Sequence, residues 1–175
     1  MRLCLVALYM LIFAIGGIAA NLAHASDRIQ WKGPFPVTIL EIKDGDTAQV
    51  VVRGACPFGC ITVNKKHVIA IRLSGIDAPE IHACKTSVSN SCAICPQELA
   101  LAKQAKARVL DLLPPGAAVR VVNLSPDKYR GRVVGDLQVF QGGQWRSISA
   151  TLVNEQLAVP YAGKTKIKPW CEATP

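Results

Sequence analysis

Short runs of apolar, mostly β-branched residues, separated by turns rich in glycine, proline and aspartate, dominate the middle of the chain. This pattern is typical of β-strands. It predicts strands at 35–43, 47–53, 67–76, 117–124 and 132–140. The sequence "DGD" between the first two runs predicts a tight hairpin. The stretch "GACPFGCITVNKK" before the third run predicts a loop or a hairpin extension.

Two other segments have the apolar spacing of helices. Between residues 96 and 113, apolar residues recur every three or four positions, at Leu99, Ala102, Ala105, Val109 and Leu113. The sequence "PPG" ends this helix. A second, shorter helix is expected at 147–157.

The predicted order is three strands, a helix, two strands and a helix. We therefore expect an α+β fold, a five-stranded OB-type β-barrel with one helix between strands three and four and a C-terminal helix. No repeat or low-complexity linker divides residues 26–175, so a single domain is expected there. Such barrels carry nucleic-acid or oligosaccharide sites, but the fold alone does not give the function.

Residues 1–25 have the features of an export signal. A positive start, Met1-Arg2, precedes an apolar run, and "AHA" at 23–25 forms a small-x-small cleavage site. Cleavage after Ala25 would place the domain in a bacterial periplasm or outside the cell. The apolar run is also long enough for an uncleaved anchor, the one arrangement in which a membrane would be a partner.

The net charge and the cysteines limit the possible binding partners and the redox compartment of the protein. The chain carries a formal charge of +8, which is compatible with nucleic acid, anionic lipid or acidic polysaccharide. Loss of Cys4 with the signal leaves an even number of cysteines, which in an exported chain favours disulfides. Cys56 and Cys60 are candidates for a local bridge. A zinc site formed by the histidine and cysteines of "HACKTSVSNSCAIC" is the alternative.

Three motifs contain residues with catalytic potential, namely "DGDT" at 44–47, "RLSGIDAPE" at 72–80 and "DKYRGR" at 127–132. Taken singly, each has a structural explanation. The first fits a hairpin turn and the third a solvated turn. In the second, Asp77 and Glu80 fit the cap of a helix.

Taken together, the three motifs favour phosphodiester hydrolysis. In a small barrel, Asp46 and Asp77 can meet at one rim and supply two carboxylates to a hard cation such as calcium. Arg72 and Arg132 provide planar guanidinium groups for phosphate. Glu80 remains to orient or deprotonate a water molecule.

These motifs, with "LVNEQLA" at 152–158, resemble the staphylococcal nuclease (thermonuclease) family in order and spacing from about Pro36 to Tyr161. The resemblance implies an OB-fold nuclease that cleaves DNA and RNA with calcium and little sequence preference. Magnesium or another divalent cation is the alternative cofactor. The resemblance also favours a disulfide between Cys95 and Cys171, because the chain ends close to a Trp-Cys pair.

The resemblance also assigns roles to individual residues. It makes Asp46, Asp77 and the carbonyl oxygen of Ala78 ligands of calcium, with Asp44 close to the metal. It makes Arg72 a phosphate-binding residue and Glu80 the general base.

The "DKYRGR" motif supplies the remaining residues. Lys128 and Tyr129 match positions that contact the nucleotide. The family places glycine and then arginine directly after the tyrosine, whereas Arg130 intervenes here. Either Arg130 or Arg132 could face the phosphate, and we favour Arg132 because it follows Gly131 and leads into the strand.

The leading interpretation is an exported, calcium-dependent nuclease. The alternative is a catalytically inactive nucleic-acid-binding OB module. Carboxylates beside a polyanion repel it unless a cation intervenes, and this argues for the enzyme. An oligosaccharide-binding module is disfavoured, because Trp31, Trp145 and Trp170 do not cluster in the sequence.

Overall fold

The computed structural model describes residues 29–82, 94–163 and 169–171. The predicted signal segment, Cys84 and Cys92 lie outside this part of the chain. The elements are β1 (Phe35–Ile42), β2 (Thr47–Val52), β3 (Ile61–Val63), β4 (Lys66–Leu73), β5 (Ile76–Asp77), α1 (Pro96–Leu112), β6 (Val119–Pro126), β7 (Arg132–Gln141), β8 (Gln144–Ser147), α2 (Ile148–Asn154), β9 (Val159–Pro160) and the 3-10 helix η2 (Pro169–Cys171).

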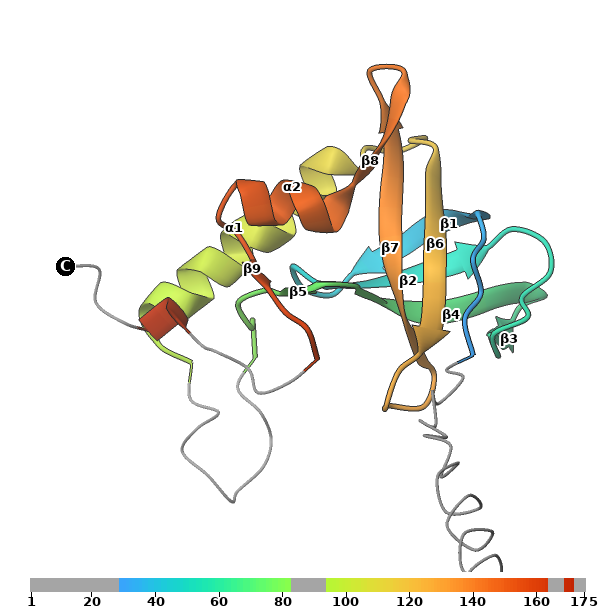
Figure 1. Cartoon of the computed structure of the whole chain (residues 1–175), viewed down its shortest axis with the longest axis horizontal. Coiled ribbons are helices and arrows are strands. Elements are labelled where there is room, and N and C mark those ends of the chain that lie inside the picture. Colours follow the sequence, from blue (N-terminus) through green and yellow to red (C-terminus); the bar gives the residue numbers. More distant parts are fainter. Residues whose placement is uncertain (1–28, 83–93, 164–168, 172–175) are drawn as a thin grey trace, which may run out of the picture.

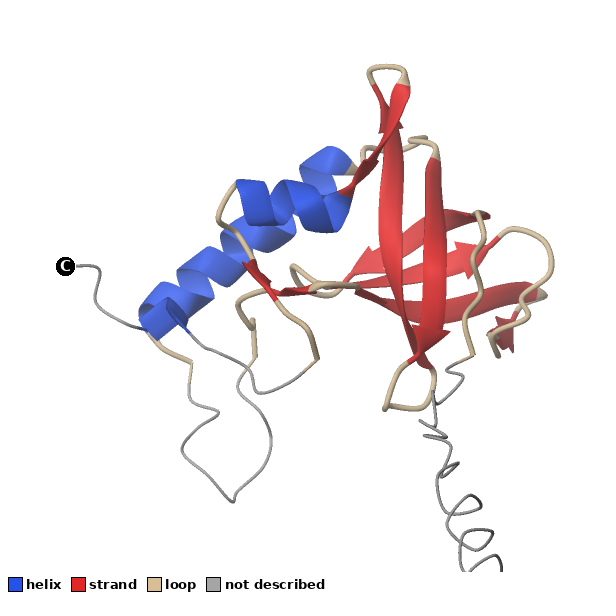
Figure 2. Cartoon of the chain, in the orientation of Figure 1, coloured by secondary structure: helices blue, strands red, loops and turns tan. Residues whose placement is uncertain are grey.

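The main sheet has the order β3-β4-β2-β1-β6-β7-β8 and closes into a barrel through pairing of β4 with β7. This pairing is parallel, whereas the other pairings of the sheet are antiparallel. Five strands, β1, β2, β4, β6 and β7, form the closed barrel, and the two helices lie together at one end of it (Figures 1 and 2). The predicted five-stranded OB-type α+β fold is confirmed.

The core follows from the alternation along the strands. Residues such as Val50, Ile71 and Leu137 point into the barrel and are fully buried, while their sequence neighbours are at least partly exposed. Helix α1 buries the face that contains Ala102, Ala105 and Val109, as its apolar spacing predicted.

Several element boundaries differ from the predictions, and the strand expected at 117–124 runs from Val119 to Pro126. The strand expected at 67–76 ends at Leu73, because Ser74 and Gly75 make a turn in which Gly75 has a φ of +77°. The chain then continues as β5, which pairs with β9. The stretch before β4 is a hairpin extension that contains β3, one of the two outcomes expected. The second helix begins at Ile148, after the unpredicted strand β8, and ends at Asn154.

Two disulfides are present in the described part of the chain, Cys56–Cys60 and Cys95–Cys171. Both were expected. Because the disulfide occupies the sulfur of Cys95, the alternative zinc site cannot use this residue. The other two cysteines of that alternative are those outside the described residues.

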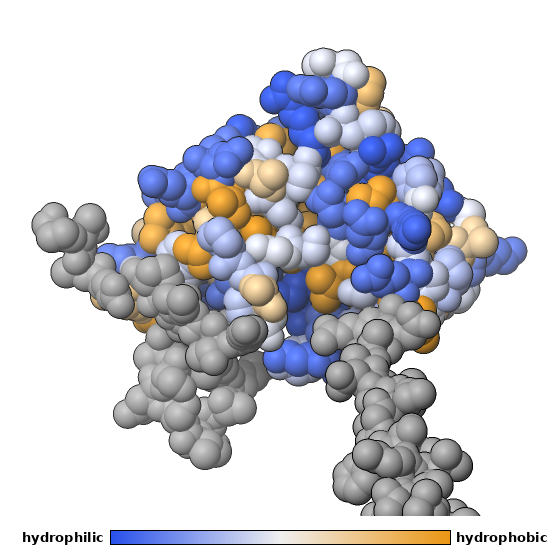
Figure 3. All heavy atoms as spheres, viewed as in Figure 1, coloured by the Kyte–Doolittle hydropathy of each residue, from blue (hydrophilic) through white to orange (hydrophobic). Residues whose placement is uncertain are grey.

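The visible surface is mainly hydrophilic. In Figure 3, apolar residues on this face form small separate groups, and polar residues cover most of the barrel and of the projecting β7–β8 hairpin. Among the described residues, no helix combines the length and apolar character that crossing a membrane requires.

Candidate active site

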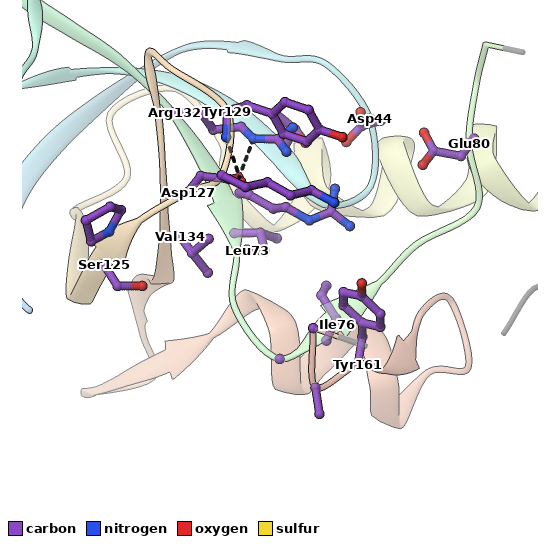
Figure 4. A pocket seen from close by; sticks show the side chains of 17 residues that line it. Asp44, Leu73, Ile76, Glu80, Ser125, Asp127, Tyr129, Arg132, Val134 and Tyr161 are labelled. Atoms are coloured by element: carbon purple, nitrogen blue, oxygen red, sulfur yellow. Dashed lines mark hydrogen bonds and ion pairs between the residues drawn. The ribbon is translucent and has the colours of Figure 1, made fainter. Parts of the chain in front are cut away.

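A pocket of about 740 Å³ lies where the hairpin turn before β2, the end of β4, the β6–β7 loop and the segment after β9 meet. Figure 4 shows Tyr129 and Tyr161 on opposite sides of this pocket, with the Glu80 carboxylate directed toward it. The residues lining the pocket come from all three sequence motifs, and they include Asp44, Arg72, Glu80, Lys128, Tyr129 and Arg132. The fold therefore brings the three motifs to one place.

The pairing of β2 with β4 positions the first carboxylate. Thr47 is the register partner of Arg72, so Asp46, the residue before it, lies beside the end of β4. The backbone N–H of Leu73 donates a hydrogen bond of 2.7 Å to the carbonyl oxygen of Asp46, and this bond fixes the turn against the strand.

Arg72 lies between the two carboxylates that the sequence predicted to meet. Its Nη1 donates to Asp46 Oδ1 at 3.1 Å, and its Nη2 lies 3.0 Å from both Asp46 Oδ2 and Asp77 Oδ1. The side chains of Asp46 and Asp77 are almost fully buried, and that of Arg72 is 15% exposed. Because this ion-pair cluster is desolvated, each member depends strongly on the others.

Several further bonds fix the Asp46 carboxylate. The backbone N–H of Ala78 donates to Oδ2 at 3.2 Å, and the hydroxyl of Thr47 donates to Oδ1 at 3.0 Å. Asp44 accepts a 3.0 Å bond from the backbone N–H of Asp46. A Cβ at Gly45 would lie 2.9 Å from the side chains of both Ala78 and Ala105, so only glycine fits here.

Burial opposes the ion pairs of this cluster. It raises the pKa of Asp46 from 3.8 to about 6; Arg72 lowers that pKa and Asp44 raises it. Burial acts to lower the pKa of Arg72, but Asp46, Asp77, Glu80 and Asp44 outweigh it, and the pKa is raised. Four carboxylates thus act on one guanidinium.

This donor set fits a hard divalent cation. Carboxylates in excess over the neighbouring arginine offer the oxygen ligands that calcium and magnesium prefer. Within the described part of the chain, one trio of His, Cys, Asp and Glu residues has its ligand atoms within 4.8 Å of one another, namely Cys95, Glu98 and Cys171. Because its two cysteines are joined to each other, that trio is not a metal site. A cation at the pocket would be coordinated by a few carboxylate oxygens together with backbone, water or substrate oxygens.

The parallel pairing of β4 with β7 places the second predicted arginine. Arg132 is the register partner of Ala70, and Val134 is the partner of Arg72, so the two guanidinium groups come from the same face of adjacent strands. Arg132 Nε donates to Asp127 Oδ2 at 2.6 Å, drawn as a dashed line in Figure 4. Its guanidinium carbon lies 4.9 Å from the ring centre of Tyr129.

The other residues of the "DKYRGR" motif lie around Arg132. Lys128 and Tyr129 both line the pocket. Lys128 Nζ is 5.1 Å from the ring centre of Tyr129, which is 57% exposed. Arg130 is exposed and lies outside the pocket lining. The motif is also a turn, because Asp127 Oδ1 accepts from the backbone N–H of Tyr129 at 3.3 Å.

The segment after β5 carries the remaining predicted residues. Ala78 is buried beside Asp46, and Glu80 is half-buried at the edge of the pocket. The helix cap considered for Asp77 and Glu80 is wrong, because residues 78–82 are not helical. The backbone N–H of Glu80 instead donates to the carboxylate of Glu98 in α1, at 3.3 Å.

Sequence reasoning missed three residues of this region. Asp127 lies in the third motif, and its ion pair with Arg132 was not predicted. Tyr161 lines the pocket because its backbone N–H bonds to the carbonyl of Gly75, which only the pairing of β5 with β9 brings close. Glu98 has a polar neighbour, Gln97, and nothing in its spacing distinguished it from an exposed helix residue.

Comparison with known proteins agrees with this architecture. No curated protein sequence matches the chain. A family model described as "Staphylococcal nuclease homologue" matches residues 70–170, more than half of the chain. The match covers Arg72, Asp77, Glu80 and Arg132, and Asp46 lies before it, joined to it by the ion pair with Arg72. The chain therefore belongs to the staphylococcal nuclease homologue family.

Proposed function

We propose that this protein is an exported, calcium-dependent nuclease that hydrolyses phosphodiester bonds of DNA or RNA with little sequence specificity. The observation that supports this most strongly is that Arg72, Glu80 and Arg132 line one pocket, while the buried Asp46 and Asp77 are both ion-paired with Arg72 beside it. Asp44 and Glu80 in the pocket lining and the buried Asp46 and Asp77 beside it would repel a phosphate unless a cation lies between them. This arrangement therefore fits a metal-assisted enzyme better than a binding module.

The acidic residues have separate roles in this proposal. Asp46, Asp77 and the carbonyl oxygen of Ala78 would hold the cation, and Asp44 supports Asp46 by accepting a hydrogen bond from the backbone N–H of Asp46. When bound, calcium would polarise the scissile phosphate and offset the negative charge of the carboxylates. Glu80 orients the attacking water molecule and accepts its proton.

The basic and aromatic residues bind the substrate. Arg72 and Arg132 donate hydrogen bonds to phosphate oxygens as negative charge develops on them in the transition state. Asp127 holds the Arg132 guanidinium in place. The exposed ring of Tyr129 offers a surface on which a base can stack, and Lys128 beside it contacts the nucleic-acid backbone.

The proposal of export rests on residues 1–25 and on the disulfides. Cys95–Cys171 links residues far apart in the sequence, and such bonds persist in oxidising compartments such as the periplasm or the extracellular medium. Mass spectrometry of the protein recovered from the compartment checks this, because the mature chain should begin at Ser26. A retained leader would support the anchored form instead.

The nuclease proposal is tested with oxidised protein, supercoiled plasmid and single-stranded RNA, in calcium, magnesium or excess EGTA. We expect cleavage in calcium, its loss in EGTA, and a decrease of about 100-fold or more in R132A. E80Q should also lose most activity. R130A is the matched control, because it removes the same charge two residues away and outside the pocket lining. A protein that binds both substrates but cuts neither in any metal would be the binding module.

A further inference from the structure

Glu98 is a buried carboxylate that lies outside the pocket and has no role in the proposed mechanism. It is 1% exposed, in the first turn of α1. A carboxylate in this environment is costly unless hydrogen bonds and local dipoles compensate for the lost hydration. The positive end of α1 supplies part of that compensation, because Glu98 is the third residue after the N-cap, Cys95.

The contacts of Glu98 connect two distant parts of the chain. Its Oε1 accepts a 3.3 Å hydrogen bond from the backbone N–H of Glu80. Its Oε2 lies 3.7 Å from the Sγ of Cys171. Its own backbone N–H donates to the Sγ of Cys95 at 3.3 Å. The carboxylate is thus enclosed between the Cys95–Cys171 disulfide and the backbone of the predicted general base.

The backbone at Glu80 has no regular secondary structure to hold it. The ladder between β5 and β9 ends at Asp77, and residues 78–82 belong to no helix or strand. Two backbone N–H groups in this segment bond to buried carboxylates. That of Ala78 donates to Asp46 on the pocket side, and that of Glu80 donates to Glu98 on the helix side. These two bonds fix the direction in which the chain leaves the pocket.

We propose that Glu98 is a positioning residue that fixes the backbone of Glu80, and that the Cys95–Cys171 disulfide braces Glu98 in this place. The inference rests on the proposed function only for its effect on catalysis, since the hydrogen bond itself can be measured without any activity. Its consequence is that a covalent link at the C-terminal end of the chain supports the geometry of the pocket. A misplacement of a catalytic group by about 1 Å can cost roughly 100-fold in rate.

Two substitutions separate the hydrogen bond from simple packing. Glu98→Gln keeps an acceptor of the same shape, whereas Glu98→Met fills a similar volume and offers no comparable acceptor. Amide hydrogen exchange, followed residue by residue by NMR, reports on the Glu80 N–H directly. We expect protection of this amide in the wild type and in E98Q. In E98M we expect exchange at Glu80 to be about 10-fold faster or more, with little change in the barrel strands.

Kinetics give the second measurement. We expect E98M to lower kcat about 10- to 100-fold, with KM and the calcium Kd within about twofold of the wild type, and E98Q to restore most of kcat. A residue with only a structural role would lower thermal stability in both variants and would not separate kcat from KM. If E98M does not fold, Glu80 protection in the wild type and its retention in E98Q still test the hydrogen bond.

The disulfide is tested with C95S/C171S. Serine keeps the N-cap of α1, so this variant removes the covalent link while it keeps an acceptor for the Glu98 N–H. C56S/C60S is the control, because it removes the other disulfide, whose residues do not line the pocket. We expect faster exchange at Glu80 in the first variant and no change in the second.

The outcomes distinguish the two proposals. An unprotected Glu80 amide in the wild type, or equal protection in E98M, would overturn the positioning role. Unchanged exchange at Glu80 in C95S/C171S would overturn the bracing role of the disulfide. The Glu80 amide could be protected only when Glu98 is present, in a protein that cleaves no nucleic acid. This result would support the positioning role of Glu98 and contradict the nuclease proposal.

Discussion

The raised pKa of Asp46 makes a quantitative prediction about the stability of the protein without metal. In the folded state, burial raises this pKa from 3.8 to about 6. Between these pH values the folded chain keeps a proton that the unfolded chain releases, so a rise in pH favours unfolding through this group. Its stabilising contribution is complete below about pH 4 and is lost by the time the pH has passed about 6. The difference in pKa corresponds to about 3 kcal/mol.

The comparison with Asp46→Asn isolates this contribution. Asparagine has nearly the same shape but does not titrate, so the ionisable groups outside this cluster contribute alike to the pH dependence of both proteins, and the difference reports on Asp46 and the groups that interact with it. Absolute stability will also differ, because the substitution removes the ion pair with Arg72. The informative quantity is therefore the change with pH in the difference between the two free energies of unfolding.

Urea unfolding in EGTA, followed by tryptophan fluorescence between pH 4 and pH 7.5, measures this difference between the free energies of unfolding of the wild type and D46N. We expect the free energy of unfolding of the wild type, relative to D46N, to fall by about 2 kcal/mol over this range, less than the full difference because the unfolded carboxyl is already partly ionised at pH 4. Parallel curves for the two proteins would refute the reasoning. A relative gain of the wild type with rising pH would also refute it, because the attraction of Arg72 would then outweigh burial.

The proposed metal site adds an expectation that can be measured separately. A proton competes with calcium for Asp46, so the calcium affinity should fall about 10-fold from pH 7 to pH 5. Isothermal titration calorimetry in buffers of different ionisation enthalpy measures both the affinity and the proton released. A pH-independent affinity would exclude Asp46 as a ligand that titrates near pH 6.

Three further results are expected. G45A should lose about 1–3 kcal/mol of stability in urea unfolding, because its Cβ would lie 2.9 Å from two alanine side chains. In a plasmid-nicking assay, R132A should lose about 100-fold in rate and R130A less than about threefold; the reverse order would make Arg130 the phosphate ligand. Reduction of Cys95–Cys171, which are 76 residues apart, should cost about 4 kcal/mol in thermal or urea unfolding.

The barrel could be predicted from the sequence because its signals are local. Runs of apolar, mostly β-branched residues and the Asp-Gly hairpin are properties of a few neighbouring residues, and they predicted the five barrel strands to within a few residues. The sequence did not predict short strands that form only by pairing with another short strand. Strands β5 and β9 have two residues each and form only because they pair with each other.

The pocket could be predicted in part, for a related reason. Asp46, Asp77 and Arg72 belong to motifs whose charged residues are unusual beside buried strands, so their chemistry was evident before their positions were known. The preference for Arg132 over Arg130 used the same kind of local argument, and the structure places Arg132 in the pocket lining. The contact between Arg72 and both carboxylates required the register of β2 against β4, which the sequence does not specify.

Glu98 illustrates why the rest could not be predicted. Its neighbours in α1 are typical of a solvent-facing helix start, and the apolar spacing of the helix assigns the buried face to other residues. It is buried because the segment with Trp170 and Cys171, more than 70 residues later, lies over the first turn of the helix. A buried carboxylate is tolerated there only because the Glu80 backbone N–H and the helix terminus compensate it. The environment of Glu98 therefore depends on three segments at once, and no local pattern contains that information.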